Sequence, residues 1–160
     1  MYNTLVVGLG NPILSDDGVG VIVAYEVAQL LESKNRNDVT VTEASVGGLR
    51  LMELMIGYDR VILVDAIIGS NGSLPGDIHH MNLDDLREIS PTQHSTCAHD
   101  TSLVTALDLG KTIGLALPSQ ISIYAIEVSN ITDFNDELTP EVVAAVPITV
   151  SAVLAELNSA

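Results

Sequence analysis

Short β-branched apolar runs alternate with segments of helical periodicity along this chain of 160 residues. Strands are predicted at residues 5–9, 39–44, 61–66 and 121–127, a short edge strand at 77–81, and helices at 19–32, 49–56, 101–113 and from the N-cap Thr139 onward. This alternation favours a mostly parallel sheet that is covered by helices on both faces. No linker, internal repeat or low-complexity tract interrupts the pattern. We therefore expect one α/β domain over residues 1–160.

A turn rich in glycine and acidic residues follows the first predicted strand, between Gly8 and Gly20. Turns of this kind usually bind a phosphate through backbone N–H groups and the positive end of the helix. Here Asp16 and Asp17 stand in the turn, so we expect it to repel a phosphate and to attract a cation. A structural interpretation is also open, because acidic residues near a helix N-terminus stabilise its dipole. One carboxylate suffices for that role, which leaves the other to explain.

Ligands of open α/β sheets bind beyond the carboxyl ends of the strands. This rule selects three places, namely the turn with Asp16 and Asp17, Asp65 at the end of the third strand, and the loop before the helix at 101–113. That loop carries His94, Cys97 and His99, and His99 is favoured over His94 because it immediately precedes the helix. Two carboxylates and one imidazole suit a divalent transition metal and leave coordination positions open. An alternative interpretation is that Asp65 only caps the loop that follows the third strand. Cys97 lies near His99, but no oxyanion motif supports a thiol nucleophile, and we interpret it as a packing residue.

The charge balance restricts the partners, since six Lys and Arg face 21 Asp and Glu, for a net charge of −15. Nucleic-acid binding needs clustered basic residues, and an anionic membrane surface is disfavoured for the same reason. No aliphatic run reaches the roughly 18 residues of a membrane helix, and no secretory signal is visible. A single cysteine fits a reducing compartment. We expect a cytoplasmic protein with neither nucleic-acid nor membrane partners.

Taken in order, the motifs resemble those of the hydrogenase maturation protease family over nearly the whole chain. The matching segments are Gly8-Leu9-Gly10-Asn11, Asp16-Asp17-Gly18-Val19-Gly20, Glu43 with Gly47-Gly48-Leu49, Val61-Ile62-Leu63-Val64-Asp65-Ala66, His99 with Leu103, and Leu138-Thr139-Pro140-Glu141. The resemblance implies a three-layer α/β/α sandwich with about five strands, one of them antiparallel. It also implies a hydrolase, namely an aspartic-type endopeptidase. Such an enzyme removes the C-terminal extension of a nickel–iron hydrogenase large-subunit precursor after nickel insertion.

The resemblance also implies roles for individual residues. Asp17, Asp65 and His99 match the family's metal-contacting positions, where the family often has Glu in place of Asp17. They would recognise nickel that the precursor carries, so the free enzyme is expected to hold no tightly bound metal. Asp16 and Asp17 are the candidates for activating water, and nickel acting as a Lewis acid is the alternative mechanism. The expected partner is the nickel-loaded precursor, bound by a monomeric enzyme.

Two other functions compete with this interpretation. A nickel chaperone or metal-sensing module would use the same acids and His99 without cutting a peptide bond. The segment Gly8-Leu9-Gly10-Asn11-Pro12 also resembles the opening of bacterial peptidyl-tRNA hydrolases. That family continues with a glycine and with an Arg-His-Asn run, which this chain lacks, and a net charge of −15 is unsuited to tRNA.

Overall fold

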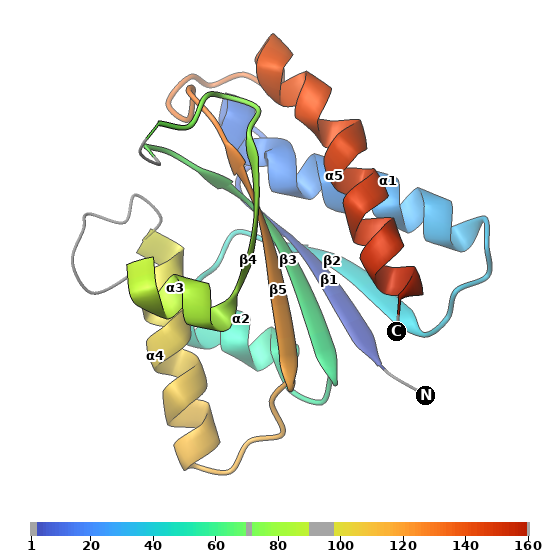
Figure 1. Cartoon of the computed structure of the whole chain (residues 1–160), viewed down its shortest axis with the longest axis vertical. Coiled ribbons are helices and arrows are strands. Elements are labelled where there is room, and N and C mark those ends of the chain that lie inside the picture. The colour runs from blue at the N-terminus through green and yellow to red at the C-terminus, as the bar shows by residue number, and fades with distance from the viewer. Residues whose placement is uncertain (1–2, 70–71, 90–97, 160) are drawn as a thin grey trace.

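A five-stranded sheet forms the middle layer of the molecule (Figure 1). The computed structural model describes residues 3–69, 72–89 and 98–159. The strands are β1 (Thr4–Leu9), β2 (Val39–Ala44), β3 (Arg60–Ile67), β4 (Ile78–Asn82) and β5 (Gln120–Glu127), in the spatial order β2-β1-β3-β5-β4. All neighbouring pairs are parallel except β4 and β5, which are antiparallel. The predicted edge strand thus supplies the one antiparallel pair.

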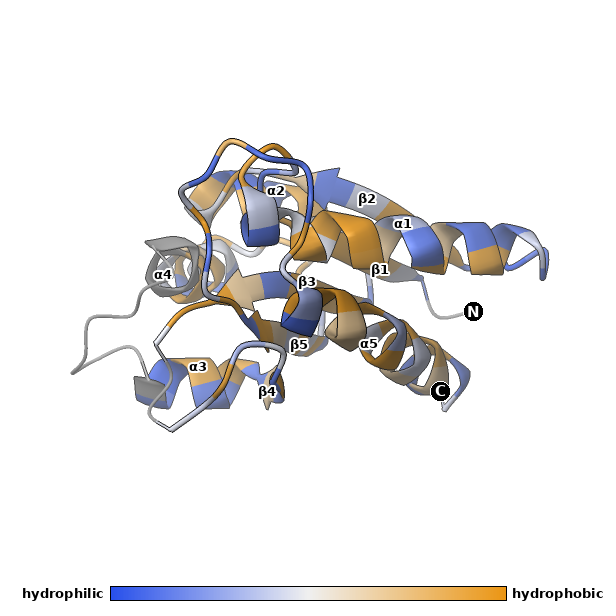
Figure 2. Ribbon diagram, turned by 90° about the horizontal axis from the view of Figure 1, so that it is seen from above, coloured by the Kyte–Doolittle hydropathy of each residue, from blue (hydrophilic) through white to orange (hydrophobic). Residues whose placement is uncertain are grey.

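Helices cover both faces of this sheet. They are η1, a 3₁₀ turn (Ser15–Gly18), α1 (Val19–Glu32), α2 (Gly48–Met55), α3 (Leu83–Ile89), α4 (Ala98–Thr112) and α5 (Pro140–Asn158). The view from above shows α1 and α5 on one side of the strands and α3 and α4 on the other (Figure 2). The three-layer α/β/α sandwich predicted from the sequence is confirmed.

The side chains of β3 alternate between two separate hydrophobic cores. Ile62 and Val64 pack in the core under α1 and α5. Val61 and Leu63 pack in the opposite core, which α2 and α4 complete. The central strand is therefore buried on both faces, as its continuous apolar sequence predicted.

The N-terminal end of α1 lies unusually close to the sheet because Gly20 has no side chain. A Cβ atom at this position would overlap the backbone carbonyl oxygens of Leu9 and Val64. Direct contact between the helix backbone and two neighbouring strands fixes where α1 begins. It thereby fixes η1, the turn that carries Asp16 and Asp17.

Helix α3 was not predicted, although its sequence contains a capping signal. The side-chain Oδ1 of Asn82 accepts the backbone N–H groups of Asp84 and Asp85, and Asp85 Oδ2 accepts the N–H of Asn82 in return. This reciprocal pair is a capping box, and it starts a helix inside a segment that is polar enough to pass for a loop.

The last helix, α5, is long and apolar enough to cross a membrane by length and composition. In the structure one of its faces packs against α1 and the sheet through buried residues such as Val142, Val146 and Val153. A core helix of an α/β sandwich has the same composition, since both environments select apolar side chains.

The environment of Tyr124 on β5 leads us to expect that the free energy of unfolding falls at alkaline pH. The residue is 5% exposed, and its phenol donates a hydrogen bond to Glu156 Oε2 at 2.8 Å. Burial, and then the Glu156 carboxylate, raise the pKa of Tyr124 above its ordinary value near 10. Because the folded state resists ionisation of the phenol, stability is full below pH 10 and falls as the pH rises above it. In urea unfolding between pH 8 and 11, a Tyr124→Phe variant should show a shallower fall than the wild type.

Candidate active site at the carboxyl edge of the sheet

The strand order places a topological switch point between β1 and β3. From β1 the chain passes to β2 on one side and then returns to β3 on the other. The connections that leave β1 and β3 therefore run to opposite sides of the sheet, and ligands of such sheets bind at the carboxyl edge beside a switch point. Asp17 follows β1 and Asp65 lies near the end of β3, so both predicted acids flank this point.

Asp17 is held in place by the turn that precedes it. The residue is half-buried, and its Oδ2 accepts the backbone N–H of Asn11 at 2.8 Å. Gly10 permits this close turn, because it adopts a φ of +130° and a Cβ there would overlap the carbonyl oxygen of Asp17. The glycine in the motif thus serves to bring an acid, instead of a phosphate, to the end of β1.

Asp65 is 6% exposed and continues the alternation of side chains between the two faces of β3. Val61 and Leu63 face the layer of α2 and α4, so Asp65 belongs to the same face. Its Oδ1 accepts the backbone N–H of Ala66 at 2.8 Å. This face is the one that α4 covers, and His99 is the second residue of α4. The topology therefore supports a shared site for Asp65 and His99, while the His99 side chain lies outside the described part of the structure.

Asp16 has a very different environment from its neighbour, because it is completely buried. Its Oδ1 accepts the backbone N–H of Thr139 at 2.7 Å, and its Oδ2 accepts the N–H of Asn130 at 3.1 Å. The Thr139 hydroxyl lies 3.0 Å from both oxygens. Thr139 stands at the predicted N-cap of α5, but it bonds to Asp16 without capping the helix through its side chain. Asp16 thus ties η1 to the segment between β5 and α5.

A third buried carboxylate at this edge, Glu127, was missed by the sequence analysis. It ends β5, pairs in register with Ile67, and is 4% exposed. Its Oε1 accepts the backbone N–H of Gly69 at 2.7 Å, and Oε2 lies 3.6 Å from His79 Nε2. The signal was present in the sequence, since Glu127 follows an apolar strand as Asp65 does.

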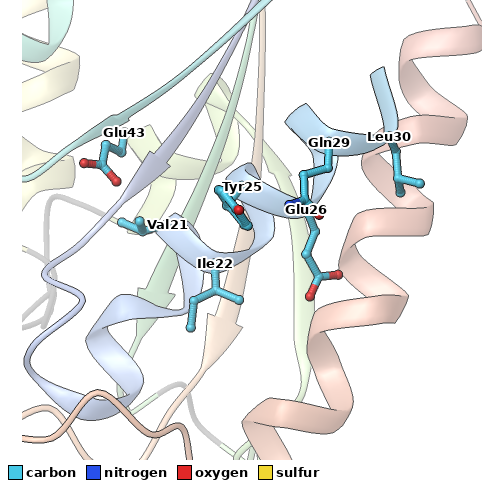
Figure 3. A pocket seen from close by; sticks show the side chains of 7 residues that line it. All are labelled: Val21, Ile22, Tyr25, Glu26, Gln29, Leu30 and Glu43. Carbon is cyan, nitrogen blue, oxygen red and sulfur yellow. The ribbon is translucent and has the colours of Figure 1, made fainter. Parts of the chain in front are cut away.

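Glu43, which the resemblance included, does not join this site. Glu43 is exposed on the edge strand β2 and lines a groove along α1 with Tyr25 and Glu26 (Figure 3). Cys97 lies outside the described residues. Where side chains are described, no three His, Cys, Asp or Glu residues come close enough to hold a metal ion. The Asp17, Asp65 and His99 set stays a prediction.

Comparisons with known proteins agree with this architecture. A family model described as hydrogenase maturation protease matches residues 23–156. The hydrogenase expression/formation protein HupD of Rhizobium leguminosarum bv. viciae is 25% identical over 157 residues, which cover 97% of this chain and 74% of HupD. The hydrogenase maturating endopeptidase HybD from E. coli superposes with a TM-score of 0.81 at 23% identity, covering 99% of this chain and 93% of HybD. HybD from Thermococcus kodakarensis, a [NiFe] hydrogenase maturation protease, gives 0.67 at 26% identity, covering 96% and 97%.

Proposed function

Because this chain belongs to the hydrogenase maturation protease family, we propose that it removes the C-terminal extension of a nickel–iron hydrogenase large-subunit precursor once nickel has been inserted. The observation that carries the proposal is the pair Asp17 and Asp65 at the β1–β3 switch point, on the side where α4 begins. Membership of the family makes the protein a peptidase of hydrogenase maturation. The proposal adds the nickel dependence and the residues that produce it.

The nickel is part of the substrate in this proposal. Asp17, Asp65 and His99 would contact nickel that the precursor already holds, and carboxylate and imidazole groups are both ordinary ligands of such a metal. Within the described residues, Asp17 Oδ1 accepts no hydrogen bond, while Oδ2 is bonded to Asn11. The hydrogen bond to Oδ2 thus fixes the orientation of the carboxylate and, with it, the position of Oδ1. A precursor without nickel gives these groups nothing to bind, so it would be left uncut.

The surroundings of the two adjacent acids favour Asp17 over Asp16 as the base that activates water. A general base must reach the water molecule from which it takes the proton. Asp17 is half-buried, whereas Asp16 is fully buried and both of its oxygens already accept hydrogen bonds. The carboxylate would take a proton from water as the water attacks the scissile carbonyl, and would return it to the departing amine as the C–N bond breaks, without a covalent intermediate. This is the chemistry of an aspartic-type peptidase.

The test is a cleavage assay on the cognate precursor, prepared with and without nickel and analysed by intact mass. We expect loss of a C-terminal peptide from the nickel-loaded precursor only. Cleavage of both forms would leave the peptidase and refute nickel recognition.

A cognate, nickel-loaded precursor that stays intact would refute the proposed function. Stoichiometric nickel in the isolated protein, measured by metal analysis after equilibrium dialysis, would then favour a chaperone. The proposal expects the isolated protein to retain little nickel, because the nickel belongs to the precursor and is only contacted by the enzyme.

A further inference from the structure

The segment between β5 and α5 presents a large apolar side chain to solvent. Phe134 is the only phenylalanine of the chain, and it is 85% exposed. Ile13, in the turn after β1, is 55% exposed, and Ile131 is 37% exposed. Single exposed apolar residues are common on protein surfaces, but an aromatic ring with apolar neighbours on a fixed backbone is typical of a binding anchor.

Backbone hydrogen bonds hold this segment, residues 129–139, against the turn after β1. Asn135 N–H donates to the carbonyl of Ile13 at 3.1 Å, and Ser15 N–H donates to the carbonyl of Asn135 at 2.7 Å. The segment is also fixed at both ends by Asp16, through Asn130 and Thr139. Phe134 therefore stands on a pre-ordered loop, which lowers the entropy cost of binding.

The same loop lies beside the candidate active site. Asn135 pairs with Ser15, the first residue of η1, and Asp17 belongs to the same short turn. In Figure 1 the connection from β5 to α5 and the end of β1 meet at one end of the sheet. A partner that covers Phe134 is thereby brought over the carboxyl edge, where Asp17 and Asp65 lie.

The charges around Phe134 have one sign. Asp133, Asp136 and Glu137 are exposed on the loop, and residues 129–139 and 8–20 contain no Lys or Arg. An apolar anchor within a ring of carboxylates is complementary to an apolar pocket bordered by basic side chains. Acidic peptides and anionic surfaces are disfavoured by repulsion.

We propose that Phe134 anchors the protein to the folded body of the precursor, in an apolar pocket that is bordered by Lys or Arg side chains. This proposal rests on the proposed function for the identity of the partner. The anchor is separate from the residues that contact nickel, and it provides affinity for the precursor. Docking through the loop of residues 129–139 leaves the carboxyl edge of the sheet free to receive the C-terminal segment of the precursor.

The test measures the Kd between the full-length protein and the nickel-loaded precursor by biolayer interferometry, with Phe134→Ala and Phe134→Leu variants. Truncation of an anchor typically weakens binding by about 10-fold or more. We expect this loss for Phe134→Ala and a smaller one for Phe134→Leu. An Asp133→Asn/Asp136→Asn double variant should slow association and reduce its dependence on salt. The matched control is Ile113→Ala, because Ile113 is 65% exposed and follows α4 at the opposite edge of the sheet.

Equal affinities of wild type and Phe134→Ala would overturn the docking proposal, whether or not the precursor is cleaved. The absence of any binding by the wild type would overturn it as well. Size-exclusion chromatography tests the alternative that a second copy of the chain, instead of the precursor, covers Phe134. A change in oligomeric state with unchanged precursor affinity counts against the proposal. The cleavage assay is separate, so a wild type that binds through Phe134 but does not cut would refute the proposed function alone.

Discussion

An Asp65→Asn variant is expected to lose at least about 100-fold of its precursor-processing rate while it stays folded. Asparagine has nearly the shape of aspartate, and its carbonyl oxygen preserves the hydrogen bond from Ala66 N–H. The substitution removes the negative charge of the side chain and keeps its shape. Binding of a divalent cation depends far more on this charge than on the shape. Initial rates from intact mass, at a fixed concentration of nickel-loaded precursor, measure the loss.

The matched control for this variant is Asp59→Asn. Asp59 lies just before β3, at the opposite edge of the sheet, where its Oδ2 accepts the N–H of Asn3. We expect Asp59→Asn to process the precursor at the wild-type rate. Asp17→Asn should lose activity as Asp65→Asn does, because both acids flank the same switch point. A fully active Asp65→Asn variant would remove this residue from the proposed site.

An Asp16→Ala variant is expected to lose about 3–5 kcal/mol of unfolding free energy, because the donors around a fully buried carboxylate would lose their acceptor. The N–H groups of Asn130 and Thr139 and the Thr139 hydroxyl are affected. Each buried donor without a partner costs roughly 1–3 kcal/mol. Urea unfolding, followed by circular dichroism, measures the change.

The stability of Asp16→Ala also decides between two roles for this acid. Asp136→Ala is the control, since Asp136 is exposed on the same loop and its loss should leave the unfolding free energy within about 0.5 kcal/mol of the wild type. A variant of Asp16 that is as stable as the wild type but inactive would make Asp16 a catalytic residue. A destabilised variant that still cuts the precursor would show that the contacts of Asp16 stabilise the fold and are not needed for cleavage.

The sequence predicted features that depend on local pattern. Helix α1 and strand β2 begin and end where predicted, because apolar periodicity and flanking polar residues set their bounds. Asp17 and Asp65 were placed at one edge by the rule for parallel strands, and strand alternation explains the face on which Asp65 lies. Helix α3 was missed because its capping box was not recognised.

Features that depend on contacts distant in sequence were not predictable in this way. Asp16 accepts its shortest hydrogen bond from Thr139, 123 residues away, and no local pattern distinguishes it from Asp17. The same contact determines that the loop with Phe134 lies beside η1. Periodicity assigns a residue to a strand or helix, but only the folded chain shows which buried acid is occupied by structural hydrogen bonds.

The tie between Asp16 and Thr139 also bears on the timing of biosynthesis. Residues 129–139 and α5 emerge from the ribosome after the strands and helices that precede them. Before these residues are synthesised, the N–H groups that donate hydrogen bonds to Asp16 are missing. The turn with Asp17 then lacks the contacts that fix it. A chain still in synthesis therefore carries the acids of the site without the geometry that orders them. An enzyme assembled in this order acquires an ordered site only after residues 129–139 have been synthesised.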